Sequence, residues 1–89
     1  MGPRQTETSI VRLLAFAGAR DVVGAGELDL DIGGARTAGD LWPVLLRRFP
    51  GLEPYRASIR VAVNGAYATA ADPVAPGDEV ALIPPVAGG

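Results

Sequence analysis

Hydrophobic and polar residues alternate along several short stretches of this 89-residue chain, a pattern typical of β-strands with one buried face. The first stretch spans residues 9–16. Its two alternating sets are Val11, Leu13 and Ala15 on one side and Ile10, Arg12, Leu14 and Phe16 on the other. Because both sets are largely apolar, we expect a central strand with one face in the core and the other available to a partner.

Residues 27–32, 59–63 and 79–83 alternate in the same way and predict three more strands. Asn64-Gly65 is a strong signal for a two-residue hairpin turn, so another strand should follow and pair with residues 59–63. Pro76-Gly77-Asp78 reads as a tight turn before the last strand. In that strand we expect two faces, formed by Val80 and Leu82 on one side and Ala81 and Ile83 on the other.

A helical period is found between residues 37 and 49. Thr37 is a suitable N-cap, and Asp40 three residues later approximates a capping box. Apolar residues then recur on one face at Leu41, Leu45 and Phe49. Pro43 removes one backbone donor, which leaves open a kink or a later helix start. Pro50-Gly51 should end this helix.

A shorter helical turn is expected at residues 17–24, so the main elements run strand, strand, helix, strand, strand, strand. A hairpin, a helix across its face and further strands describe the β-grasp architecture, with the first and last strands parallel at the sheet centre. The predicted class is α+β, a ubiquitin-like β-grasp with a mixed sheet of about five strands on one main helix. Residues 9–83 should form this domain, residues 1–8 a flexible leader and residues 84–89 a flexible reactive tail.

The composition is that of one small globular domain, with 48% hydrophobic and 20% charged residues. Neither Cys nor His is present, so thiolate chemistry, the commonest metal ligand and the usual general base are missing. We therefore expect no metal site and no independent catalysis. A net charge of -2 argues against nucleic acid binding. No apolar run is as long as a membrane span, so we expect a cytoplasmic protein with no membrane partner.

The C-terminal carboxylate is then the chemical group of most interest. The chain ends in Pro84-Pro85-Val86-Ala87-Gly88-Gly89. Because glycine has no Cβ, a terminal Gly-Gly can enter a channel too narrow for other residues. Six extended residues at roughly 3.3 Å each reach about 20 Å, enough to carry the carboxylate into a partner's buried site. Pro84 and Pro85 should stiffen the root of this tail.

Several segments resemble the small, sulfur-carrying subunit of molybdopterin synthase. They are Val63-Asn64-Gly65, Pro76-Gly77-Asp78-Glu79-Val80-Ala81-Leu82-Ile83 and the ending Pro84-Pro85-Val86-Ala87-Gly88-Gly89. Residues 13–24 are similar too. The run from Gly-Asp-Glu-Val to the Pro-Pro-Val-x-Gly-Gly ending is the most specific part, whereas Gly-Gly alone would identify only the wider ubiquitin-like group.

The resemblance implies a non-catalytic carrier that binds no cofactor itself. An activating enzyme similar to the ubiquitin activators would adenylate the Gly89 carboxylate with ATP, and a sulfur donor protein would supply the sulfur of a thiocarboxylate. The tail would then insert into the large subunit of molybdopterin synthase, in a heterotetramer. Two such deliveries would build the dithiolene of molybdopterin from cyclic pyranopterin monophosphate.

The resemblance also implies roles for individual residues. Gly89 would hold the sulfur and Gly88 would give a slim approach, while Pro84, Pro85, Val86 and Ala87 would set the reach and fill the channel. Partners of the family dock against an apolar face of the sheet, and the matching positions here are Phe16, Tyr67 and Ile83, expected on three different strands. Tyr67 departs from the aliphatic residue usual at its position. From the residues alone, these three could equally belong to the core.

Other functions are compatible with the same ending. Sulfur carriers for cysteine, thiamine or thiolated tRNA synthesis also end in Gly-Gly, so the final sulfur acceptor stays open. A ubiquitin-like modifier attached to protein lysines is a further alternative, and a plain interaction domain with an incidental tail is another. Two acidic pairs, Asp29 with Asp31 and Asp78 with Glu79, are interpreted as solvated surface, because neither has a third cation ligand nearby in sequence.

Overall fold

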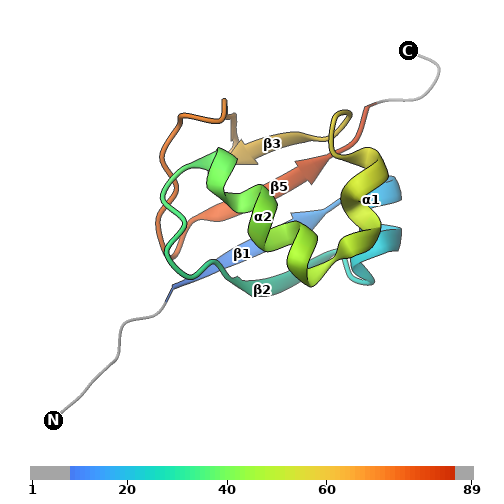
Figure 1. The fold of residues 1–89 in the computed structure, drawn as a ribbon, viewed down its shortest axis with the longest axis horizontal. Helices are drawn as coiled ribbons and strands as arrows, with labels where there is room; N and C mark the ends of the chain where they lie inside the picture. Colours follow the sequence, from blue (N-terminus) through green and yellow to red (C-terminus); the bar gives the residue numbers. More distant parts are fainter. Residues whose placement is uncertain (1–8, 86–89) are drawn as a thin grey trace, which may run out of the picture.

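The computed structural model describes residues 9–85, in which five strands form one mixed sheet with helices packed on one face (Figure 1). The predicted leader, residues 1–8, and the last four residues of the predicted tail lie outside the described residues. The strands are β1 (Ile10–Ala15), β2 (Glu27–Asp31), β3 (Arg60–Val63), β4 (Ala66–Tyr67) and β5 (Glu79–Ile83).

The strand order across the sheet is β2-β1-β5-β3-β4. The first and last strands, β1 and β5, lie parallel at the centre, and every other pair is antiparallel. β3 and β4 are joined at Asn64 and Gly65, whose φ angles of 53° and 86° are those that a two-residue hairpin turn requires. The predicted α+β β-grasp with a mixed five-stranded sheet is therefore confirmed.

The main helix, α2 (Ala38–Arg48), crosses the sheet diagonally (Figure 1). Its N-terminus carries the predicted capping box: Thr37 Oγ1 accepts from the Asp40 N–H and Asp40 Oδ2 accepts from the Thr37 N–H, both at 3.2 Å. The helix is continuous through Pro43, so it begins at the Thr37 cap and not after the proline.

Two shorter helices complete the helical layer. The predicted helical turn is present as α1 (Ala17–Val23), which contacts β1 and β5. After α2 the chain forms a 3₁₀ helix, η1 (Pro50–Tyr55), which the sequence pattern did not predict. Pro50 fixes the backbone of its first turn, and the fully buried Leu52 packs against the core. This segment is therefore held by tertiary packing, which no local sequence pattern predicts.

The core lies between the sheet and the helical layer, and the predicted alternation decides which residues enter it. In β1 and β5 the inward residues are buried, as expected, and β2, α2 and η1 contribute further buried leucines. The largest fully buried side chains include Val11, Leu13, Leu30, Leu41, Leu45, Leu52, Val80 and Leu82. None of the helices in residues 9–85 is long and apolar enough to cross a membrane.

Candidate docking face and tail root

The sheet face turned away from α2 carries the outward residues of the same strands. Directly paired residues share a face of a sheet, and the register pairs Tyr67 with Ala62, Ala62 with Ala81, and Ala81 with Leu14. These four residues therefore form one row across β4, β3, β5 and β1. The adjoining row contains Arg60 paired with Ile83.

This face is hollowed. We call the depression of about 290 Å³ the open-face hollow. It is lined by Leu14, Phe16, Ala62, Gly65, Tyr67, Glu79, Ala81 and Ile83. Phe16 and Tyr67 are 49% and 61% exposed, which is unusual for large apolar side chains in so small a domain, and exposed apolar patches of this kind mark interaction sites.

The three residues predicted to contact a partner are brought together around this hollow. Tyr67 lies in β4 and Ile83 in β5, but Phe16 lies outside β1, which ends at Ala15, so the expectation of three different strands is wrong for Phe16. Phe16 is instead the N-cap residue of α1. The cause is Ala17, whose φ of 50° is rare for a residue with a Cβ and turns the chain out of the strand.

An acidic strip borders the apolar hollow on the same face. The outward residues of β2 are Glu27, Asp29 and Asp31, all exposed. Arg12 Nη1 donates to Glu27 Oε2 at 2.6 Å, and the Arg60 guanidinium lies 4.6 Å from the centre of the Tyr67 ring. No group of three or more potential metal ligands is found within residues 9–85.

One carboxylate of this strip is held by local hydrogen bonds. The Ser9 hydroxyl donates to Asp31 Oδ1 at 2.6 Å, and the Gly33 N–H donates to the same oxygen at 2.9 Å. These two donors stabilise the ionised form and lower the pKa of Asp31 below its ordinary value of 3.8. The pairing fixes the end of β2 against the start of β1.

The tail leaves the domain at the end of β5. This strand is hydrogen-bonded to β1 on one side and β3 on the other, so the tail root has a rigid base. Pro84 is half-buried and Pro85 exposed. The remaining predicted tail and reactive residues, Val86, Ala87, Gly88 and Gly89, lie outside the described residues.

A second hollow, of about 340 Å³, lies at this point on the helical side of the sheet. We call it the tail-root hollow. Its walls are residues 17–19 at the start of α1, Tyr55 at the end of η1, Ser58 and Ile59, and Pro84 and Pro85. The sequence pattern did not predict this hollow, because it forms where three segments far apart in the chain meet. The available signal was Tyr55, an aromatic residue in the proline- and glycine-containing segment 50–55.

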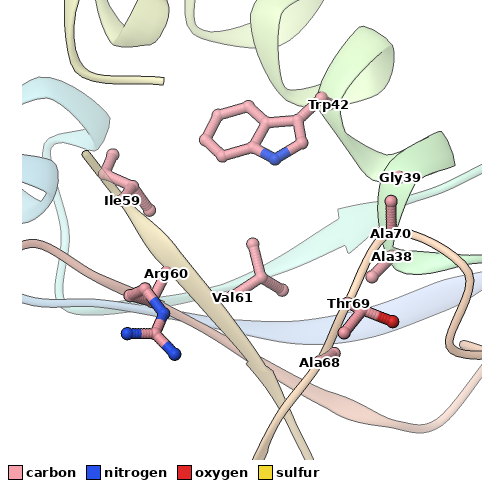
Figure 2. A pocket seen from close by; sticks show the side chains of 9 residues that line it. All are labelled: Ala38, Gly39, Trp42, Ile59, Arg60, Val61, Ala68, Thr69 and Ala70. Carbon is pink, nitrogen blue, oxygen red and sulfur yellow. The ribbon is translucent and has the colours of Figure 1, made fainter. Parts of the chain in front are cut away.

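A third hollow, of about 160 Å³, separates α2 from β3 and the loop after β4 (Figure 2). In Figure 2 the Trp42 ring faces Ile59 and Val61 across it. The loop is pinned to the helix start, because the Gly39 N–H donates to the Ala70 carbonyl at 2.9 Å and a Cβ at Gly39 would lie 3.0 Å from Ala70 Cβ. We interpret this hollow as a packing feature.

Comparisons with known proteins agree with this geometry. Residues 13–89 match the ThiS family. The molybdopterin synthase sulfur carrier subunit of Aedes aegypti is 38% identical over 95 residues, covering 99% of this chain and 97% of that protein. Small archaeal modifier protein 1 of Haloferax volcanii is 35% identical over 82 residues, covering 83% of this chain and 94% of that protein.

Solved structures share the fold. The crystal structure of the Haloferax volcanii modifier has a TM-score of 0.76 at 34% identity, covering 90% of this chain and 99% of that chain. A chain from the protein–protein complex of subunits 1 and 2 of the molybdopterin-converting factor of Helicobacter pylori has a TM-score of 0.62 at 22% identity, covering 90% and 99%.

The family match extends from residue 13, within β1, to the last residue, so it includes most of the sheet, all three hollows and the Gly88-Gly89 ending. The resemblance drawn from the sequence is thereby confirmed. This chain belongs to the ThiS family and is similar to molybdopterin synthase sulfur carrier subunits.

Proposed function

We propose that this protein is the sulfur carrier of molybdenum cofactor biosynthesis. Its Gly89 carboxylate is adenylated with ATP by an activating enzyme, converted to a thiocarboxylate with sulfur from a donor protein, and then delivers that sulfur to cyclic pyranopterin monophosphate. The chain itself is a non-catalytic subunit and works in the cytoplasm. The large subunit of molybdopterin synthase supplies the active site, in a heterotetramer.

One observation carries this proposal. The match to the ThiS family runs from residue 13 through β5 to Gly89, and the sulfur carrier subunit of Aedes aegypti is similar over 99% of this chain. The ending follows directly on a central strand that is hydrogen-bonded on both sides, so the tail begins from a fixed place in the sheet. A slim carboxylate on a rigid base suits delivery into an enclosed site, where an acyl intermediate is protected from water.

The open-face hollow is the proposed docking surface for the large subunit. It is apolar, it is rimmed by Phe16, Tyr67 and Ile83, and it lies on the strand that leads into the tail. Interfaces of this kind are dominated by a few aromatic and aliphatic anchors. Docking there places the tail root directly beside the partner, and Pro84, Pro85, Val86 and Ala87 then set how deeply Gly89 enters.

Intact mass spectrometry of the protein purified from its own cells tests the carrier chemistry. We expect a species heavier by the exchange of one oxygen for sulfur, and we expect that species to disappear when Gly89 is deleted. A matched control is deletion of Gly2 near the other end of the chain, which should leave the heavier species in place. An unmodified C-terminus in cells that are making molybdenum cofactor would contradict the proposal.

The sulfur acceptor requires a separate experiment. The thiocarboxylated protein is mixed with the purified large subunit of molybdopterin synthase and cyclic pyranopterin monophosphate, and molybdopterin formation is followed. A thiocarboxylate that stays intact in this mixture and forms no molybdopterin would point instead to the carriers of cysteine, thiamine or thiolated tRNA synthesis.

A protein modifier is the second candidate function, because the Haloferax volcanii protein to which this chain is similar is named a modifier. The two functions share an activated Gly89 and differ in the acceptor. Lysine-linked adducts of this chain, detected by mass spectrometry of its own cell extract, would support the modifier. Their absence alongside a thiocarboxylate would support the carrier.

A further inference from the structure

The open-face hollow and the tail-root hollow meet at the base of the tail. Phe16 and Ile83 line the open-face hollow, and the next residue of each segment, Ala17 and Pro84, lines the tail-root hollow. The two hollows therefore adjoin along the chain at two places, one after the end of β1 and one after the end of β5. A protein that covers one of them reaches the edge of the other.

The tail-root hollow also carries an exposed aromatic residue. Three large apolar side chains are strongly exposed in residues 9–85: Phe16 and Tyr67 on the open face, and Tyr55, at 48%, in the tail-root hollow. Tyr55 ends η1, whose hold on the core is the buried Leu52. About half of the Tyr55 surface is therefore left uncovered by the domain's own packing.

The length of the tail limits where a partner can lie. Four residues follow Pro85, and at roughly 3.3 Å each they reach about 13 Å. A protein that encloses the Gly89 carboxylate must therefore come within that distance of Pro85. Because Pro85 is part of the wall of the tail-root hollow, such a protein lies close to the edge of this hollow.

We infer that the tail-root hollow is a second docking surface for the protein that receives the tail, and that it takes one apolar side chain of that protein, of the leucine, methionine or phenylalanine kind. The inference rests on the proposed function, since it requires a tail-receiving partner. The hollow of about 340 Å³ is large enough, because an apolar cavity of about 150 Å³ already holds a benzene ring. The partner then contacts the base of the tail from both faces of the sheet.

Filling the hollow tests the inference. Ser58 and Gly18 both line the hollow; Ser58 is exposed and an added Cβ at Gly18 has no atom within 4 Å, so Ser58→Trp and Gly18→Leu add bulk at its walls without entering the core. The control is Ala71→Trp, an exposed position in the loop before β5. Binding to the large subunit of molybdopterin synthase from the same organism is measured by calorimetry, with circular dichroism melts of each variant.

Both filling variants are expected to weaken binding by about tenfold, the loss typical of one well-packed anchor, and Ala71→Trp is expected to bind as the wild type does. Saturation transfer from the large subunit to the Tyr55 ring of the wild-type protein gives a second readout that needs no variant. Phe16→Ala on the open face serves as the reference.

Two outcomes separate the inference from the function on which it rests. If Phe16→Ala weakens binding while both filling variants bind normally and the Tyr55 ring receives no saturation, the tail-root hollow is not a docking surface and the proposed function stands. If the wild-type protein does not bind the large subunit at all, the proposed partner and the inference both fail.

Discussion

The two faces of the sheet are built from the same strands but differ in what their residues contribute. Leu13 and Leu82 point toward α2 and are at most 1% exposed. Their chain neighbours Leu14 and Ile83 point the other way, line the open-face hollow and stay partly exposed. Neighbouring residues of similar size and hydrophobicity therefore contribute differently: those on the covered face stabilise the fold, and those on the other form the face proposed above for docking.

This difference explains why the open face is apolar at all. Burial of apolar surface stabilises the fold by about 25 cal/mol per Å², so a side chain that stays exposed contributes little to folding. Phe16 and Tyr67 are about half exposed or more, and a fold selected for stability alone has no use for them there. In the complex proposed above, a partner would cover these side chains, and their apolar surface would then contribute to binding.

The largest expected effect is on stability and belongs to the helix-covered face. Leu82→Ala leaves a cavity beneath α2 and should lower the free energy of unfolding by about 2–5 kcal/mol. Ile83→Ala, one residue away on the same strand, removes a partly exposed side chain and should cost less than about 1 kcal/mol. Denaturation by urea measures both. Equal losses would show that the two faces do not differ in the way described.

The next effect belongs to the open face. Substitutions there should change binding to the partner and leave the stability of the fold nearly unchanged. Phe16→Ala should alter the free energy of unfolding by no more than about 0.5 kcal/mol. Binding to the large subunit of molybdopterin synthase should weaken by about tenfold or more, and Ile83→Asp should weaken it further by placing a charge in the hollow.

Arg47→Ala, an exposed substitution on α2, is the control for this binding experiment. It should leave the affinity for the large subunit unchanged. If Phe16→Ala and Ile83→Asp bind as tightly as this control, the open face is not the docking surface.

Much of this comparison could be predicted from the sequence, because a period of two residues decides which face a side chain joins. The buried set in β1 and β5 follows directly from alternation. The Asn64-Gly65 turn and the Thr37–Asp40 capping box are equally local signals, and both are present. The resemblance added Phe16, Tyr67 and Ile83, which alternation alone could not separate from the core.

The rest depended on packing between distant segments. The positive φ of Ala17, which takes Phe16 out of β1, carries no sequence signal, because glycine or asparagine is the usual marker of such a turn. The helix η1 follows from the burial of Leu52. The tail-root hollow needs residues 17–19, 55–59 and 84–85 in one place, which only the assembled fold provides.

The smallest expected effect is on the pH dependence of stability. It comes from two carboxylates, Asp40 on the helix-covered side of the sheet and Asp31 beside the open face. The backbone N–H of Arg36 donates to Asp40 Oδ2 at 3.1 Å, and with the Thr37 side chain it lowers the pKa of Asp40 below 3.8, as Ser9 and Gly33 do for Asp31 beside the open face. A lowered pKa in the folded state means that each carboxylate stabilises the fold above pH 3.8 and loses this contribution as the pH falls through the folded value. Asp40→Asn and Asp31→Asn should therefore lower the melting temperature slightly at pH 7, and the difference from the wild type should vanish in melts at strongly acidic pH. A difference that stays constant with pH would show that the negative charge is not what these hydrogen bonds stabilise.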